Sequence, residues 1–167
     1  ALVMITCPNT LGLFEDEIVE VAEMVHKAGA LLYMDGANFN ALVGLVEPAK
    51  LGFDIMHLNL HKTFSVPHGG GGPGVGPVGV GPKLVDFLPE PLVGIIEEGD
   101  DDMPPLFGYV KPSKTIGRMK AFNGHFGGGF VRSFTYIVMH GPDGLKDISQ
   151  YAVLNANYLL ARLRDTY

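Results

Sequence analysis

The stretch LVMITCPNTLGLFEDEIVEVAEMVHKAGALLYMDG (residues 2–36) contains the pattern that decides the fold. It opens with an apolar run, Leu2 to Thr6, that stops before the turn-forming pair Pro8–Asn9, as a short strand does. A second apolar run, Ala30 to Met34, ends at Asp35 and predicts a buried strand. The residues between the two runs follow a different period, so the order is strand, helix, strand.

The segment between the two strands predicts a helix. Its apolar residues recur at intervals of three and four, which places them on one helical face. Acidic residues crowd the first turn, where the helix dipole favours anions, and Gly29 stands where a C-cap belongs. The apolar face consists of Phe14, Ile18, Val21, Val25 and Ala28.

A further strand is predicted over residues 53–60, after a short irregular or helical link. The order strand, helix, strand, strand is typical of an α/β fold with a mostly parallel sheet flanked by helices. Ligands of such sheets bind beyond the carboxyl ends of the strands. Asp35 and the pair His61–Lys62 follow two such ends, so we expect the chemistry there.

Composition narrows the class of protein. The chain has 167 residues, enough for one domain with a core, and is 47% hydrophobic with 18% charged residues. A chain this apolar either buries part of its surface in an oligomer or is a segment of a larger domain. Because the sequence starts abruptly in a strand, we expect the second explanation, a segment of a larger domain. A net charge of −6 argues against nucleic-acid binding, and no apolar stretch is long enough to cross a bilayer. The single cysteine, Cys7, fits a reducing compartment.

Polar and apolar residues alternate in HLNLHK (57–62), which predicts that His57, Asn59 and His61 share one face of a strand. Such a polar face needs hydrogen-bonding partners, which either a polar ligand or solvent at an edge strand would supply. For Lys62, the alternative to a functional role is that of an ordinary solvated lysine on the surface. Asp35 is either a turn residue or a partner for a cationic ring nitrogen.

Two rival sites are disfavoured. The glycine-rich stretch 67–82 satisfies a GxGxxG pattern, but prolines interrupt it and no strand directly precedes it, so it is not a dinucleotide-binding turn. His57 and His61 have the spacing of metal ligands on a helix, but the alternation around them indicates a strand. Downstream, EEGDDD (97–102) predicts an exposed turn. A last amphipathic helix is predicted from the stripe Leu145, Ile148, Ala152, Ala156, Leu159 and Leu163.

Several segments together resemble a known family. They are CPNTLGLFE (7–15), LLYMDGANFNA (31–41), HLNLHKTFSVPHGGGGPGVGPVGV (57–80) and AVLNANYLLARL (152–163). They are similar to the P-protein of the glycine cleavage system, with the best match to the second subunit of its split form. The resemblance implies an aminotransferase-like (fold type I) large domain that depends on pyridoxal 5′-phosphate. It also implies decarboxylation of glycine and transfer of the aminomethyl group to a lipoyl-bearing carrier protein.

The same resemblance suggests roles for individual residues. Lys62 resembles the lysine that forms the Schiff base with pyridoxal phosphate. Asp35 resembles the partner of the pyridine nitrogen, and Ala37 would pack against the face of the ring. An ionised Asp35 would keep the ring nitrogen protonated, so that the ring accepts the electrons released as carbon dioxide leaves.

Three more residues would belong to the site. Asn59 and His61 match positions from which related enzymes contact the phosphate or the substrate, and Asn38 would lie near the phenolic oxygen of the cofactor. The resemblance further implies that residues 1–145 belong to the cofactor-binding large domain. Residues 146–167 would form a helix that leads toward a carboxyl-terminal domain.

The partners implied are glycine, the lipoyl-bearing H carrier protein, and either the first P-protein subunit or a second copy of the chain. Neither nucleic acid nor a membrane is expected as a partner. The split form would be cytoplasmic, and a eukaryotic one would be in the mitochondrial matrix. Two other functions stay open: another fold type I lyase or aminotransferase-like enzyme, and a non-catalytic fragment kept as an assembly partner.

Overall fold

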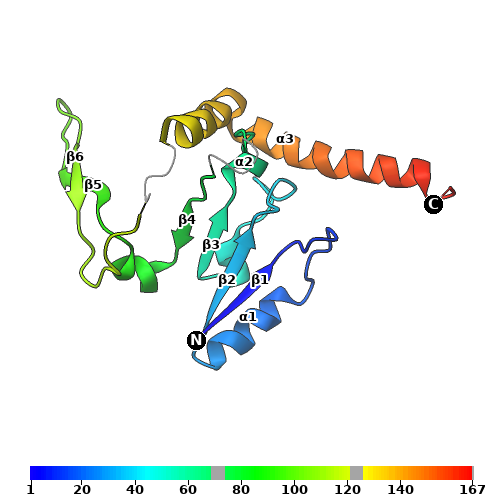
Figure 1. Cartoon of the computed structure of the whole chain (residues 1–167), viewed down its shortest axis with the longest axis horizontal. Coiled ribbons are helices and arrows are strands. Elements are labelled where there is room, and N and C mark those ends of the chain that lie inside the picture. The colour runs from blue at the N-terminus through cyan, green and yellow to red at the C-terminus, as the bar shows by residue number, and fades with distance from the viewer. Residues whose placement is uncertain (69–73, 121–125, 167) are drawn as a thin grey trace. The chain divides into compact units, whose positions relative to one another are not determined.

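The computed structural model describes residues 1–68, 74–120 and 126–166 (Figure 1). The chain forms two compact units, residues 1–79 with 124–167, and residues 80–123. The elements in chain order are β1 (Leu2–Thr6), α1 (Ile18–Lys27), β2 (Leu31–Gly36), the 3-10 helix η1 (Pro48–Leu51), β3 (Ile55–Leu58), α2 (Leu60–Thr63), β4 (Val78–Val80), the 3-10 helix η2 (Pro82–Phe87), β5 (Leu92–Glu97), β6 (Leu106–Val110), the π-helix η3 (Phe126–Val131) and α3 (Arg132–Leu163).

The first unit is built on a sheet in the order β1-β2-β3-β4. The pairs β1/β2 and β2/β3 are parallel, which confirms the predicted α/β fold with a mostly parallel sheet. Next to β3, the bonds Leu58 N–H to Pro77 O and Leu60 N–H to Val75 O have the residue order of an antiparallel pair. The segment with Pro77 therefore lies at the edge of the described sheet, where a proline-rich strand is tolerated.

Helix α1 begins four residues later than the spacing predicted. Phe14 lies outside it, because residues 15–18 form a turn in which Ile18 N–H donates to the carbonyl oxygen of Glu15 at 3.3 Å. The carboxyl end agrees with the prediction. Gly29 has φ +73°, its N–H donates to His26 O, and the next N–H donates to Val25 O, which is the Schellman arrangement.

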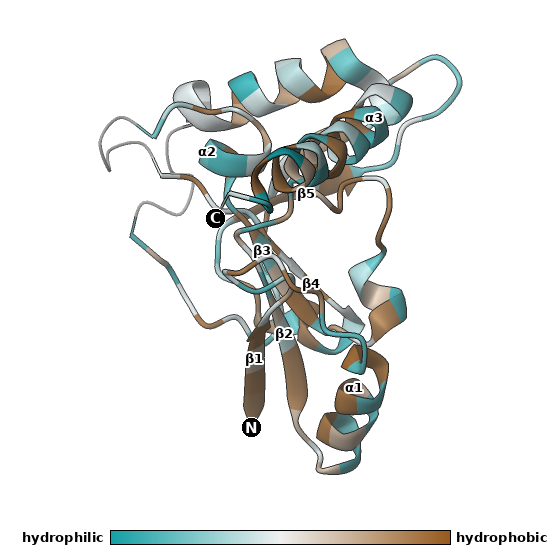
Figure 2. Cartoon of the chain, turned by 90° about the vertical axis from the view of Figure 1, so that its right-hand side faces the viewer, coloured by the Kyte–Doolittle hydropathy of each residue, from teal (hydrophilic) through white to brown (hydrophobic). Residues whose placement is uncertain are grey.

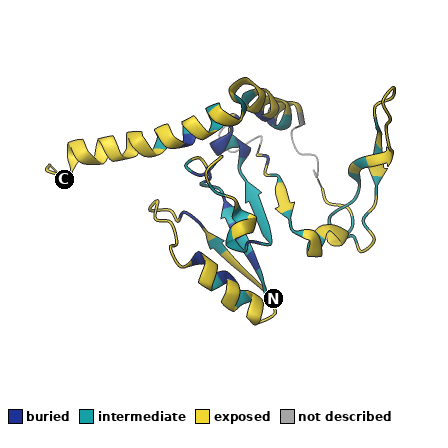
Figure 3. Ribbon diagram, turned by 180° about the vertical axis from the view of Figure 1, so that it is seen from behind, coloured by how far each residue is buried: buried dark blue, intermediate teal, exposed yellow. Residues whose placement is uncertain are grey.

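The face of β2 toward α1 is apolar. Leu32 and Met34 are fully buried, and they pack in one cluster with Ile18 and Ala22 of α1. Because side chains alternate along a strand, Tyr33 and Asp35 point to the opposite face. Figure 2 shows apolar β1 and the apolar side of α1, and Figure 3 shows that burial is concentrated around the sheet. The core thus lies on one face of β2 and leaves the other face for polar groups.

A second cluster lies around α2, where Leu60, Phe64, Val66 and Val75 are buried. A Cβ on Gly129 of η3 would come within 2.5 Å of the Val75 side chain. The glycine-rich run before α3 therefore allows the backbone of η3 to approach Val75 closely. The run Gly69–Gly72, for which close approach to a ligand or subunit was predicted, lies outside the described residues.

Helix α3 is two helices joined at Gly141, which has φ +63° and precedes Pro142. Its middle is attached to the loop after β2, where Ser149 Oγ donates to Val43 O at 2.9 Å. The predicted stripe is half-buried as far as Ala152, but Leu159 and Leu163 are exposed (Figure 3). Among the described residues, no helix is both long and apolar enough to cross a membrane.

The second unit contains an antiparallel hairpin of β5 and β6 with Gly94 opposite Gly108. Side chains fold over the two glycines, since a Cβ on Gly108 would meet Ile96 and one on Gly94 would meet Val110. The acidic segment predicted as an exposed turn over residues 97–102 is exposed; its first residue, Glu97, is the last residue of β5, and residues 98–102 lie outside the strand.

Candidate functional site

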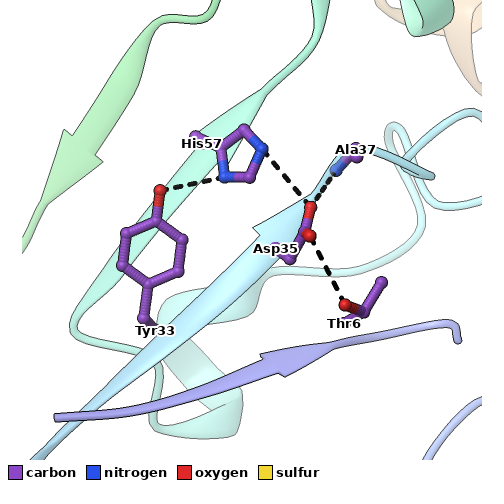
Figure 4. A network of polar contacts seen from close by, with 5 residues as sticks. All are labelled: Thr6, Tyr33, Asp35, Ala37 and His57. Atoms are coloured by element: carbon purple, nitrogen blue, oxygen red, sulfur yellow. Dashed lines mark hydrogen bonds and ion pairs between the residues drawn. The ribbon is translucent and has the colours of Figure 1, made fainter.

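Asp35 lies at the end of β2, in the same register position as Thr6 of β1 and His57 of β3. Three groups surround its carboxylate (Figure 4). The Ala37 N–H donates to Oδ1 at 2.9 Å, His57 Nε2 lies 3.3 Å from Oδ1, and Thr6 Oγ1 donates to Oδ2 at 3.4 Å. The side chain keeps 23% of its surface exposed, so the carboxylate is held in place and still reachable.

His57 connects Asp35 to Tyr33. The Tyr33 hydroxyl lies 2.9 Å from His57 Nδ1, and the two rings are tilted by 46° with centroids 5.7 Å apart. Burial, and then the negative charge of Asp35, raise the pKa of the Tyr33 phenol above its ordinary value. The phenol therefore stays protonated at neutral pH and can donate a hydrogen bond.

The strand predicted over residues 53–60 is shorter than expected, and this corrects one prediction about the site. Strand β3 ends at Leu58, Asn59 is the extended N-cap residue, and α2 begins at Leu60. His61 therefore lies on a helical turn, not on the strand face of His57 and Asn59. The chain turns there because Lys62 N–H and Thr63 N–H both donate to Asn59 O.

Lys62 lies on the exposed side of α2, directly beyond the carboxyl end of β3. Asp35 is the penultimate residue of the neighbouring strand β2, so both residues lie at the same edge of the sheet, as predicted. In the described part of the chain, the Lys62 amino group has no hydrogen bond or ion pair. A primary amine in this position is free to react with a carbonyl group.

His61 differs from Lys62 in its surroundings. Its Nδ1 is buried and has no hydrogen-bond partner among the described residues, and its ring contacts His68 edge-on with centroids 4.4 Å apart. Burial, followed by the nearby charges of His68 and Lys62, lowers the pKa of His61. Two other buried oxygens, Thr63 Oγ1 and Ser133 Oγ, also lack a partner in the described residues.

Backbone strain marks the same segment. Ser65, three residues after Lys62, has φ +58°, a left-handed conformation that is uncommon outside glycine. Strained residues of this kind cluster at functional sites, where the surrounding structure holds them in place. On the other side, Asn38 follows Ala37 in the turn after β2, and no hydrogen bond or ion pair in the described residues joins Asn38 to Asp35, Lys62 or His61.

The residues fit a cofactor that has a carbonyl group and a basic ring. Lys62 offers an unengaged amine, Asp35 an oriented carboxylate, and His61 Nδ1 is a buried polar atom without a partner. A ligand with hydrogen-bonding groups would satisfy that atom. Among the described residues, no group of three or more His, Cys, Asp or Glu side chains could hold a metal ion.

Sequence reasoning missed two members of the network and left a third without a role. Tyr33 could have been found, because it lies two residues before Asp35 and strand alternation puts both on one face. Thr6 could not, because its position opposite Asp35 depends on strand register. His57 was noticed as polar, but its partners were not predicted.

Several known proteins are similar to this chain in sequence. No family model matches it. It is 55% identical over all 167 residues to a protein of Listeria monocytogenes named probable glycine dehydrogenase (decarboxylating) subunit 2, of which it covers 33%. Proteins with the same name from Chlorobium chlorochromatii and Thermococcus onnurineus are 56% and 58% identical over 100% and 98% of the chain. The chain spans about a third of the length of these relatives.

Solved structures agree on the fold. A sphingosine-1-phosphate lyase of Burkholderia pseudomallei superposes with a TM-score of 0.60 at 15% identity, over 98% of this chain and 35% of that one. The cysteine desulfurase CsdA of Escherichia coli gives 0.51 at 17% identity, over 86% and 34%. These similarities confirm the predicted fold type I architecture.

Proposed function

We propose that this chain, whose whole length is homologous to about a third of glycine dehydrogenase (decarboxylating) subunit 2, is part of the catalytic subunit of a glycine-decarboxylating enzyme. The observation that carries the proposal is the identity of 53–58% to proteins of that name over nearly every residue of the chain. The position of Asp35 and Lys62 at one edge of the sheet supports it.

The cofactor in this proposal is pyridoxal phosphate. Lys62 would hold it covalently through the side-chain amine, and Asp35 would hold a proton on its ring nitrogen by charge attraction. Once bound, pyridoxal phosphate supplies the ring that accepts electrons when glycine loses carbon dioxide. Ala37, Asn38 and Asn59 follow β2 and β3 at this edge, and we propose that they line the cofactor as the sequence suggested.

His61 has a separate proposed role. Its lowered pKa keeps the imidazole neutral near pH 7, so it can both accept and donate hydrogen bonds. We propose that Nδ1, the buried atom without a described partner, contacts the phosphate of the cofactor or the carboxylate of glycine. A neutral imidazole would orient such an oxygen through a donated hydrogen bond.

The wider setting is part of the proposal and rests on the resemblance of the sequence to the glycine cleavage system P-protein. The aminomethyl group would pass to the lipoyl arm of the H carrier protein, and the first P-protein subunit or a second copy of the chain would complete the enzyme. Residues 1–145 would belong to the cofactor-binding domain and residues 146–167 would lead to a further domain. The enzyme would work in the cytoplasm.

Reductive labelling tests the assignment of Lys62. The complete subunit that contains this chain is loaded with pyridoxal phosphate, reduced with borohydride and digested for peptide mapping. The label is expected on Lys62 and absent from Lys62→Ala, while Lys83→Ala, in the other unit, keeps it on Lys62. A label on a different lysine, or none in a protein that decarboxylates glycine, would refute the assignment.

A further inference from the structure

We propose that Tyr33 and His57 are positioning residues for Asp35: the Tyr33 hydroxyl donates to His57 Nδ1, so that the Nε2–H of His57 donates to the carboxylate of Asp35. This inference rests on the proposed function, because Asp35 is the group that would contact the cofactor. It goes beyond that function by specifying where the protons of the network lie and what keeps Asp35 oriented.

The sheet brings the network together. Thr6, Asp35 and His57 are direct register partners across β1, β2 and β3, so their side chains lie side by side on one face. Tyr33 precedes Asp35 by two residues and shares that face (Figure 4). The other face of β2 carries the fully buried Leu32 and Met34. A row of polar side chains on a parallel sheet is unusual, and here every member has a partner.

Hydrogen-bond chemistry determines the direction of the chain. A neutral imidazole has one N–H donor and one acceptor nitrogen. The carboxylate of Asp35 can only accept, so Nε2, which lies 3.3 Å from Oδ1, carries the proton of His57. Nδ1 is then the acceptor, and the Tyr33 hydroxyl, 2.9 Å away, is its donor. Donor therefore faces acceptor at both contacts without a charge on the imidazole.

The arrangement restricts how the carboxylate can rotate. Oδ1 receives the Ala37 N–H and faces His57 Nε2, while Oδ2 receives the Thr6 hydroxyl. The Nδ1–H tautomer of His57 would present a lone pair to the carboxylate of Asp35, which is repulsive, so Asp35 itself favours the Nε2–H tautomer. Removal of the Tyr33 hydroxyl would leave Nδ1 without its donor, and the ring could then tilt away from Oδ1. Asp35 would then lose one of its orienting contacts.

The first experiment reads the tautomer in the cofactor-free protein. Solid-state ¹⁵N NMR of the complete subunit with labelled histidine, assigned by the signal lost in His57→Gln, reports which ring nitrogen carries the proton. We expect the Nε2–H tautomer in the unmodified protein and in Tyr151→Phe, a control in which an exposed tyrosine loses its hydroxyl. In Tyr33→Phe, the Nδ1 signal is expected to shift, because this acceptor nitrogen loses its hydrogen-bond donor. An Nδ1–H or doubly protonated His57 in the unmodified protein would overturn the proposal, even if Tyr33→Phe did not fold.

The second experiment reads function in the assembled, cofactor-loaded enzyme. Tyr33→Phe is expected to lower kcat for glycine decarboxylation by about tenfold, the size of one lost hydrogen bond, with a nearly unchanged KM for glycine. Tyr151→Phe should match the unmodified enzyme. If Tyr33→Phe keeps full kcat, the positioning role is wrong although the hydrogen bonds exist. If the unmodified enzyme does not act on glycine, the proposed function fails, and the tautomer measurement still decides whether the hydrogen-bonded chain is real.

Discussion

Replacement of Gly36 by alanine, which adds one methyl group, should disturb the packing of the strands at the site. Gly36 is the buried last residue of β2, paired with Leu58 of β3 and adjacent to Asp35. A Cβ at Gly36 would overlap the carbonyl oxygen of His57 and lie 3.1 Å from Leu58 Cδ2. The carbonyl belongs to a sheet backbone and cannot rotate away as a side chain would. Gly36→Ala must therefore push β3 away from β2 at the point where Asp35 and His57 meet.

The expected cost is that of overpacking a core, about 1–3 kcal/mol in the free energy of unfolding. Urea unfolding of the complete subunit, followed by circular dichroism, would measure it. Gly74→Ala is the matched control, since its Cβ would meet nothing within 4 Å. That change should be neutral or stabilising by about 0.4–1 kcal/mol through the unfolded chain. Equal midpoints for the two variants would refute the reasoning that β2 and β3 are held together by this close approach.

Two further predictions concern titrating groups. Because the pKa of His61 is lowered in the folded state, the unfolded chain takes up its proton first, and stability is lost as the pH falls below about 6.5. His61→Gln should therefore lose less unfolding free energy between pH 7 and pH 5 than the unmodified protein, and an unchanged pH dependence in urea titrations would contradict this. Cys7 is 1% exposed and burial raises the pKa of its thiol, so it should react with Ellman's reagent at least about tenfold more slowly in the folded protein than in urea. The rate is obtained by difference from Cys7→Ser, and equal rates in the two states would show that Cys7 is accessible.

Local sequence patterns were sufficient to predict the helix and strands that surround the site. The apolar run 2–6 predicted β1 with its observed bounds, and the run that ends at Asp35 predicted β2. Gly29 was identified as the end of α1 because only a residue that tolerates positive φ closes a helix in this way. Alternation was misleading in HLNLHK, where the strand stops at Leu58. A polar residue at every second position is compatible with a strand that ends and a helical turn that begins.

The sequence by itself determined the chemistry that is present: a lysine beyond one strand, an aspartate at the end of the next, and an α/β order that brings such ends to one edge. Those features depend on residues close together in the chain, whose periodicity and turn-forming character can be read directly. The tertiary structure alone decided which side chains meet. Thr6, Asp35 and His57 are neighbours because of strand register, which a shift of one residue would destroy. Register is set by how α1 and the core pack against the sheet, and therefore by contacts between residues far apart in the sequence.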